Sequence, residues 1–218
     1  MNYTAICFDL DGVIVDSEPL HRAAFRSTLS YYGHQLSDYD YEKHFAGKTD
    51  EQGFKSYFDT NNIQTPSNDL ITTKNDAYAQ LAEHGLIAYA GVPELIHMLY
   101  KETSLALVTG SSLNEAKLAL ASCGISSCFS TIVTADDISI GKPDPEGYLL
   151  ATHRLNSSTL PANCIAVEDS PSGVQAAKSA GMYCVAITTT HSAEQLQLAD
   201  IIVDQLSFDM FTKLIAVH

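Results

Sequence analysis

The sequence predicts an α/β fold: a doubly wound parallel sheet with an all-helical domain inserted near its start. After Gly91, short apolar runs typical of strands buried on both faces alternate with helix patterns. Between Ser17 and about Ala90, by contrast, every pattern is helical and no strand candidate occurs. A chain of 218 residues is long enough for such a pair of domains. We therefore assign residues 1–16 and 91–218 to the α/β core and residues 17–90 to the helical insert.

The first element is an apolar run that ends on two carboxylates. Residues 6–8 lead into Asp9-Leu10-Asp11-Gly12, so a buried strand is expected to end at Asp9. Open parallel sheets bind ligands at the carboxyl ends of their strands. Asp9 would lie on that edge, with Asp11 in the loop that follows. Taken alone, the motif is also compatible with a strand end and an Asx turn, since Asp and Gly favour turns.

Four helices are expected next, each with a recognisable start signal. Serine precedes three of them as a capping residue, and Thr49-Asp50-Glu51-Gln52 has the form of a capping box. Glycine follows the last turn of several of these helices, as is common at a C-cap. The expected helices run from Ser17 to Gly33, from Ser37 to about Phe45, from Thr49 past Phe58, and from Ser67 to Gly85.

The second part of the chain alternates helices with strands. Strands are expected at 105–109, 131–133, 164–167, 183–187 and 201–203. Helices are expected to begin at Pro93, at a second capping box that starts with Ser112, and after Ser170. Asp144 is expected to cap a further helix, with Pro145 in its first position.

Composition and charge exclude several classes of partner. The chain carries 12 Lys and Arg against 26 Asp and Glu, a formal charge of -14. Nucleic-acid backbones and anionic membranes favour clustered basic residues, so we expect neither as a partner. No apolar stretch approaches the roughly 20 residues that span a bilayer, and no signal-peptide pattern is found before Asp9. The five cysteines show no metal-ligand spacing, so we expect reduced thiols in a cytoplasmic monomer.

Two further strand ends carry groups suited to phosphate. Thr109-Gly110-Ser111-Ser112 combines hydroxyls with backbone N–H groups at a helix N-terminus, where anions bind. For this motif alone, simple helix capping is the alternative interpretation. Lys142 lies between Gly141 and Pro143 at the same edge, so it is better placed than a solvated surface lysine to neutralise phosphate charge.

A second acidic pair, Glu168-Asp169, follows the strand expected at 164–167. Two acids at a helix N-terminus can simply complement the helix dipole. Together with Asp9 and Asp11, however, they put four carboxylates on one edge of the sheet, where they repel unless a cation lies among them. Mg²⁺ prefers oxygen ligands and suits this set. We therefore expect these four residues to form a Mg²⁺ site.

The order of the four motifs, Asp-x-Asp-Gly, Thr-Gly-Ser, Gly-Lys-Pro and Glu-Asp, resembles that of the haloacid dehalogenase-like superfamily of phosphohydrolases. The helical insert directly after the first motif is similar to the cap of the β-phosphoglucomutase-like phosphatases within it. This resemblance covers the whole chain and implies a Rossmann-like core with an inserted cap domain. True dehalogenases lack an acid at the position of Asp11, so its presence favours phosphate chemistry.

The resemblance implies a role for both residues of the first acidic motif. Asp9 would be the nucleophile, which forms an aspartyl-phosphate and so divides one difficult displacement into two. Asp11 would be the general acid and base, and would also give a backbone carbonyl to Mg²⁺.

The other three motifs would bind phosphate and metal. By resemblance, Thr109 and Lys142 hold the transferred phosphoryl group, and the amides of Gly110 and Ser111 fix its oxygens. Asp169 corresponds to the main acidic metal ligand. Glu168 beside it is either a direct ligand or a partner of the ligands.

Three residues of the insert are expected to contact substrate, namely His21, Gly47 and Lys48. Related phosphomutases have a His at the place of His21, and the cap loops of the family reach substrate where Gly47 and Lys48 fall. The mutases also carry a Lys and an Arg where this chain has Ala46 and Asp50. Since a mutase must bind a second phosphate in its cap, the loss of two cations argues against that activity.

The sequence therefore predicts a Mg²⁺-dependent phosphatase that acts on a small phosphorylated metabolite such as a sugar phosphate. A hexose-phosphate mutase is the enzymatic alternative. A signalling receiver domain, which also groups acids, a Thr and a Lys around a phosphorylated Asp, is the alternative from another class. Receivers phosphorylate an Asp on an internal strand and have no helical insert, so Asp9 on the first strand argues against that class.

Overall fold

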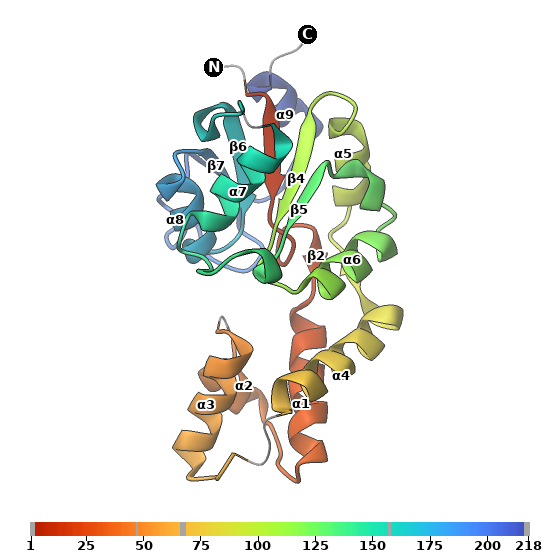
Figure 1. The fold of residues 1–218 in the computed structure, drawn as a ribbon, viewed down its shortest axis with the longest axis vertical. Coiled ribbons are helices and arrows are strands. Elements are labelled where there is room, and N and C mark those ends of the chain that lie inside the picture. The colour runs from red at the N-terminus through yellow and green to blue at the C-terminus, as the bar shows by residue number, and fades with distance from the viewer. Residues whose placement is uncertain (1–2, 47, 66–68, 157, 216–218) are drawn as a thin grey trace. The chain divides into compact units, whose positions relative to one another are not determined.

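The computed structural model describes residues 3–46, 48–65, 69–156 and 158–215 (Figure 1). The chain divides into two compact units. Met1–Asp16 and Ile87–His218 form one, which we call the core unit, and Ser17–Leu86 form the other, which we call the helical unit.

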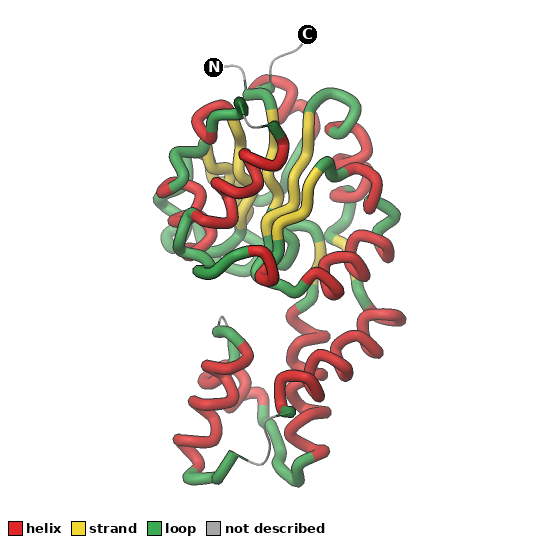
Figure 2. Tube along the Cα trace, in the orientation of Figure 1, coloured by secondary structure: helices red, strands yellow, loops and turns green. Residues whose placement is uncertain are grey.

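The core unit is built on a six-stranded sheet in the order β5-β4-β1-β6-β7-β8, with every neighbouring pair parallel (Figure 2). This order confirms the predicted doubly wound parallel sheet, because the chain moves outward from β1 first to one side and then to the other. The strands are β1 (Ala5–Phe8), β4 (Ser104–Val108), β5 (Thr131–Val133), β6 (Cys164–Glu168), β7 (Tyr183–Ile187) and β8 (Ile201–Val203).

Helices cover both faces of this sheet. One face packs on α7, which contacts β4 and β5, and on α8, which contacts β6 and β7. On the opposite face, the ring of Phe8 lies 6.1 Å from that of Phe211 in α9, and α9 contacts α5. The helices of the core unit are α5 (Val92–Leu99), α6 (Leu113–Ser122), α7 (Glu146–Leu155), α8 (Pro171–Ser179) and α9 (Phe208–Leu214), with short 3₁₀ turns at Ser126–Cys128, Ala135–Asp137 and Pro161–Asn163.

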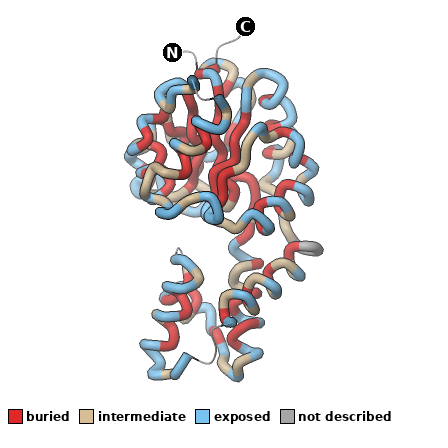
Figure 3. The backbone as a smooth tube through the Cα atoms, viewed as in Figure 1, coloured by how far each residue is buried: buried red, intermediate tan, exposed pale blue. Residues whose placement is uncertain are grey.

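Strand burial explains why the apolar runs predicted this sheet so well. The central strands are buried on both faces, as Figure 3 shows by their colour. The face under α7 and α8 is lined by small side chains, which let the helices approach closely. Those small residues are Ala5, Cys7, Ala106, Cys164, Ala166, Cys184 and Ala186. All five cysteines of the chain are free thiols.

The helical unit contains α1 (Glu18–Tyr31), α2 (Asp38–His44), α3 (Asp50–Asn61) and α4 (Leu70–Gly85). Two of its predicted caps are present. The Ser37 hydroxyl accepts from the Asp40 N–H, and Thr49 and Gln52 form the reciprocal capping box. The expected start of α4 at Ser67 lies outside the described residues, and Asp69 occupies the N-cap position. Aromatic side chains fill the interior, among them Phe25, Tyr41, Phe45, Phe54, Tyr57 and Phe58.

Three local predictions were wrong. The stretch to Ala90 is not all helical, because β3 (Ile87–Ala88) pairs antiparallel with β2 (Val15–Asp16), and two-residue strands leave no readable pattern. Helix α7 begins at Glu146 with Pro145 as its N-cap, one residue later than predicted, although Asp144 Oδ1 does accept the Glu146 N–H at 2.9 Å. Helix α9 was missed, although Ser207 caps it.

Candidate active site

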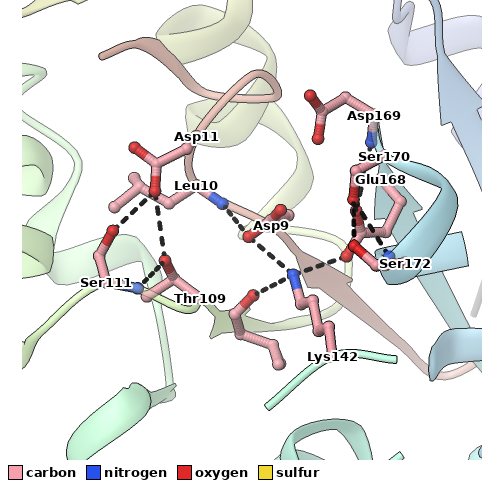
Figure 4. A network of polar contacts seen from close by, with 12 residues as sticks. Asp9, Leu10, Asp11, Thr109, Ser111, Lys142, Glu168, Asp169, Ser170 and Ser172 are labelled. Carbon is pink, nitrogen blue, oxygen red and sulfur yellow. Dashed lines mark hydrogen bonds and ion pairs between the residues drawn. The ribbon is translucent and has the colours of Figure 1, made fainter. Parts of the chain in front are cut away.

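Strand register brings predicted site residues of the core unit to one edge of the sheet, among them Asp9, Thr109 and Glu168 (Figure 4). Phe8 of β1 lies opposite Leu107 of β4 and Val167 of β6. One position further on, the Asp9 N–H donates to the Val167 carbonyl at 3.0 Å, and Glu168 is the last residue of β6. The carboxyl ends of β1, β4 and β6 are therefore level, and the polar residues that follow them are neighbours.

Lys142 lies among these strand ends. Its Nζ is 2.9 Å from Asp9 Oδ1 and 2.6 Å from Glu168 Oε1, and it donates to the Val108 carbonyl at 3.1 Å. Burial by itself would lower the pKa of Lys142, but the charges of Asp9 and Glu168 outweigh it and raise that pKa. Lys142 therefore remains a cation, and it links the two acid-bearing strands.

Asp9 has two carboxylate oxygens in different surroundings. Oδ1 accepts the Leu10 N–H at 2.8 Å and pairs with Lys142. Among the described residues, no donor contacts Oδ2. Burial and then the charge of Glu168 raise the pKa of Asp9 well above its usual value, although Lys142 opposes them.

Glu168 is fully buried, and both of its carboxylate oxygens are hydrogen-bonded. Oε1 accepts the Tyr148 hydroxyl at 2.7 Å in addition to its ion pair with Lys142. Oε2 accepts the Asp169 N–H and the Ser170 hydroxyl, each at 3.3 Å. The carboxylate lies against Gly173 of α8, where a Cβ atom would overlap all three of its outer atoms.

Asp169 is 5% exposed and lies beside Gly12 of the first acidic loop. A Cβ at Gly12 would overlap the Asp169 carboxylate, and φ of +78° at that position also favours glycine. Burial and then the charge of Glu168 raise the pKa of Asp169 to about 7. Glycine in the Asp-x-Asp-Gly motif therefore lets the two acid-bearing loops approach each other.

Asp9, Glu168 and Asp169 fit a divalent cation. Each offers one carboxylate oxygen, and these three oxygens lie within 4.8 Å of one another in a buried cluster. Three carboxylates against the single Lys142 ammonium leave two negative charges when all are ionised. Oxygen donors and this charge suit a hard divalent ion such as Mg²⁺.

The Asp11 side chain does not join that cluster, although we had expected four carboxylates there. Its Oδ2 accepts the Ser111 hydroxyl at 2.7 Å and lies 3.5 Å from Thr109 Oγ1 (Figure 4). The Ser111 N–H donates to Thr109 Oγ1 at 3.0 Å. The Asp11 carboxylate therefore faces the loop after β4.

The loop after β4 caps a helix and also contacts Asp11, and its expected contact with phosphate stays a prediction. Ser112 caps α6, with a capping box completed by Glu115, so the helix-capping alternative is correct for that serine. Thr109 and Ser111 precede the cap and point instead to Asp11. A Cβ at Gly110 would meet no atom within 4 Å, which shows open space beside the backbone there.

The remaining predicted residues belong to the helical unit. His21 stacks on Tyr78 with ring centroids 4.4 Å apart, and the exposed Lys48 donates from Nζ to the Lys43 carbonyl at 2.8 Å. Gly47 lies outside the described residues. The expected contact of these three residues with substrate stays a prediction.

Sequence reasoning missed Tyr148, Gly173 and the threonines after β7. Tyr148 lies six residues after Lys142 in the chain, and its contact with Glu168 depends on how α7 packs on the sheet. Gly173 lies five residues after Glu168, inside a helix. A glycine in a helix, where no turn requires it, can indicate that another group packs closely against the backbone at that position. The threonines follow a strand end at the same edge, so the argument used for the other strands would have found them.

A parallel sheet whose carboxyl edge holds paired acids, a lysine and hydroxyls is the architecture of a haloacid dehalogenase-like enzyme. The family model for haloacid dehalogenase-like hydrolases matches residues 6–187, and the chain belongs to this family. Within the family it is a phosphatase, as its named relatives indicate. This assignment excludes the receiver-domain alternative.

Two named relatives are phosphatases of this family, and a solved structure has the same fold. Validoxylamine A 7'-phosphate phosphatase of Streptomyces hygroscopicus subsp. limoneus is 34% identical over 207 residues, which cover 94% of this chain and 95% of that protein. Fructose-1-phosphate phosphatase of Escherichia coli (strain K12) is 30% identical, covering 84% of this chain and 95% of that protein. The crystal structure of a putative β-phosphoglucomutase from Thermotoga maritima matches with a TM-score of 0.80 at 28% identity, over 99% and 100% of the two chains. Among the described helices, none is long and apolar enough to cross a membrane.

Proposed function

We propose that the protein hydrolyses the phosphate monoester of a small sugar or sugar-like polyol, with Asp9 as nucleophile and Mg²⁺ as cofactor. The main support for this proposal is that the two carboxylate oxygens of Asp9 differ in their contacts. Oδ1 is fixed by Lys142 and the Leu10 N–H, whereas no donor among the described residues contacts Oδ2. A carboxylate oriented in this way can direct one oxygen at phosphorus. The substrate class is supported by relatives named for phosphorylated sugars or related compounds.

The proposed reaction has two displacements at phosphorus. In the first, Asp9 Oδ2 attacks, the bond to the ester oxygen breaks, and Asp11 gives that oxygen its proton. In the second, Asp11 takes a proton from a water molecule whose oxygen attacks the aspartyl-phosphate. The bond between phosphorus and Asp9 then breaks, which releases phosphate and restores both carboxyl groups.

Charge neutralisation would be shared among the groups at the sheet edge. Lys142 and the hydroxyls of Thr109 and Ser111 would contact phosphoryl oxygens. Mg²⁺, bound by Asp9, Asp169 and the Asp11 carbonyl, would supply Lewis-acid stabilisation of the same oxygens. Glu168 has both oxygens engaged by Lys142, Tyr148, Ser170 and the Asp169 N–H. We therefore assign Glu168 to the support of Lys142 and Asp169 rather than to direct ligation.

The central test is the Asp9→Asn variant. Asparagine keeps the shape of the side chain but is a poor nucleophile, so release of p-nitrophenol from p-nitrophenyl phosphate should fall below detection. Melting temperature should not fall by more than a few degrees, because the lost pairing with Lys142 is offset by relief of repulsion from Glu168. A variant that keeps more than a few per cent of activity with an intact fold would remove Asp9 from the nucleophile role.

A second experiment separates a phosphatase from the mutase alternative. In the helical unit, the buried Lys74 pairs with Asp50 at 3.0 Å, so its charge is neutralised within that unit. Mutases of the family have an Arg at the place of Asp50. With Asp50 there instead, this chain lacks a cation that would bind the second phosphate of a mutase substrate. We expect β-glucose 1-phosphate, given with a trace of the 1,6-bisphosphate, to yield free phosphate and glucose. Stoichiometric glucose 6-phosphate with negligible free phosphate would restore the mutase.

A further inference from the structure

The carboxyl end of β7 adds polar side chains to the same edge of the sheet. The residues after Ile187 are Thr188-Thr189-Thr190-His191, and we call them the β7 loop. Because β7 pairs in parallel with β6, the two strands end side by side. The β7 loop is therefore a neighbour of the segment that carries Asp169.

Thr190 contacts the side chain of Asp169 directly. Its hydroxyl donates to Asp169 Oδ2 and also lies 3.3 Å from the Asp169 carbonyl. Oδ2 is also the oxygen nearest to Gly12, so one side of the carboxylate is occupied by the protein. Among the described residues no donor contacts Oδ1 of Asp169, and one carboxylate oxygen of Asp169 belongs to the acid cluster.

The neighbours of Thr190 fix the surrounding backbone. His191 Nδ1 lies 3.0 Å from the Asp169 carbonyl oxygen and 2.8 Å from Thr190 Oγ1. Thr189 donates its hydroxyl to the Gly12 carbonyl. The β7 loop therefore contacts both the loop that follows Asp9 and the residue that follows Glu168.

We propose that the β7 loop orients Asp169 toward the divalent cation, and that Thr190 is the positioning residue. This inference rests on the proposed function, because it concerns the cation that the phosphatase would use. A hydrogen bond to a ligating carboxylate sets its direction, and loss of such a partner typically weakens metal affinity about 10- to 100-fold. Thr190 acts through Asp169 and need not touch the substrate.

The chain offers a matched control for this proposal. Thr190→Val removes the hydroxyl and keeps the β-branched shape. Thr188→Val makes the same change two residues earlier, where the hydroxyl donates to Asp204 Oδ1 at 2.7 Å, a carboxylate outside the acid cluster. Thr190→Ser keeps the hydroxyl and loses only the methyl group. The three variants separate the contact with Asp169 from a general disturbance of the loop.

The experiment measures Mg²⁺ binding by titration calorimetry without substrate, and phosphate release as a function of Mg²⁺. Thr190→Val should raise the dissociation constant for Mg²⁺ at least tenfold. The Mg²⁺ concentration at half-maximal rate should rise in parallel, and kcat should return at saturating Mg²⁺. Thr190→Ser and Thr188→Val should bind Mg²⁺ like the unmodified protein, and all should melt at similar temperatures without metal.

Each contrary result has a distinct meaning. Equal Mg²⁺ affinity for Thr190→Val and the unmodified protein would overturn the inference and leave the proposed function intact. An equal loss in Thr188→Val would also overturn it, because the effect would then belong to the loop as a whole. If the unmodified protein released phosphate without binding Mg²⁺, the metal dependence of the proposed function would fall, and this inference with it.

Discussion

Gly173→Ala should destabilise the protein strongly, although alanine is a better helix former than glycine. Gly173 lies in the first turn of α8, directly against the fully buried carboxylate of Glu168. An added Cβ would overlap that carboxylate, which is not a flexible chain end because Lys142, Tyr148 and Ser170 all contact it. The methyl group therefore requires Glu168 to leave its partners.

The expected size follows from two opposing contributions. Disrupting a buried ion pair costs about 3–5 kcal/mol. Alanine in place of glycine returns at most about 1 kcal/mol of helix propensity. The balance is a loss of about 2–4 kcal/mol, which for a chain of this size lowers the melting temperature by roughly 10 °C. Activity should fall as well, because Glu168 holds Lys142 beside Asp9.

Urea unfolding of the variant and of two matched proteins would test this reasoning. Gly141→Ala should be close to neutral in stability, because a Cβ there meets nothing within 4 Å. In a Glu168→Ala background the obstructing carboxylate is gone, so Gly173→Ala should be neutral or slightly stabilising. If Gly173→Ala costs nothing in the native background, or costs the same in both backgrounds, the steric argument is wrong.

Two further predictions concern metal binding and pH. Mg²⁺ at 100 times its dissociation constant should stabilise the folded protein by about 2.7 kcal/mol and raise its melting temperature. A melting temperature that Mg²⁺ does not change, or that it raises equally in the Asp169→Asn variant, would contradict the proposed metal site. His44 of the helical unit is 2% exposed, and its Nδ1 bonds to Ser56 while its Nε2 has no partner among the described residues. Burial, then the charges of Lys43 and Lys48, lower the pKa of His44, so the unfolded chain binds this proton more readily. Stability should therefore decline as pH falls below about 6.5, by up to about 1.4 kcal/mol per pH unit until the folded-state pKa is reached. His44→Asn should flatten this decline, and identical pH profiles of the two proteins would refute it.

The sequence predicted the sheet well because its strands are buried on both faces. Such strands read as continuous apolar runs, and each is followed by polar residues where the chain leaves the sheet. The residues expected at the edge, including Asp9, Thr109 and Lys142, are neighbours in the structure for that reason. Strand order was not needed for this result, since all parallel strands present their carboxyl ends to one side.

Contacts that depend on helix packing and loop paths could not be predicted in the same way. The bond from Tyr148 to Glu168 requires the position of α7 on the sheet, which no local pattern encodes. The direction of the Asp11 side chain depends on the tight loop through Gly12. From composition and spacing alone, four acids at one edge appeared to be one metal site. The structure instead assigns three of them to the cluster and turns Asp11 to Ser111.

This division of the acids has a consequence for the proposed chemistry. A general acid and base must exchange a proton in each half of the reaction, whereas acids that bind a metal must stay ionised throughout. Among the charged neighbours of Asp9, Glu168 raises the pKa of Asp9 more than Asp169 or Asp11 does. Ser111 and Thr109 contact the Asp11 carboxylate outside the buried cluster, so the proposed general acid and base is a different residue from the acids of the cluster, where Lys142 pairs with Asp9.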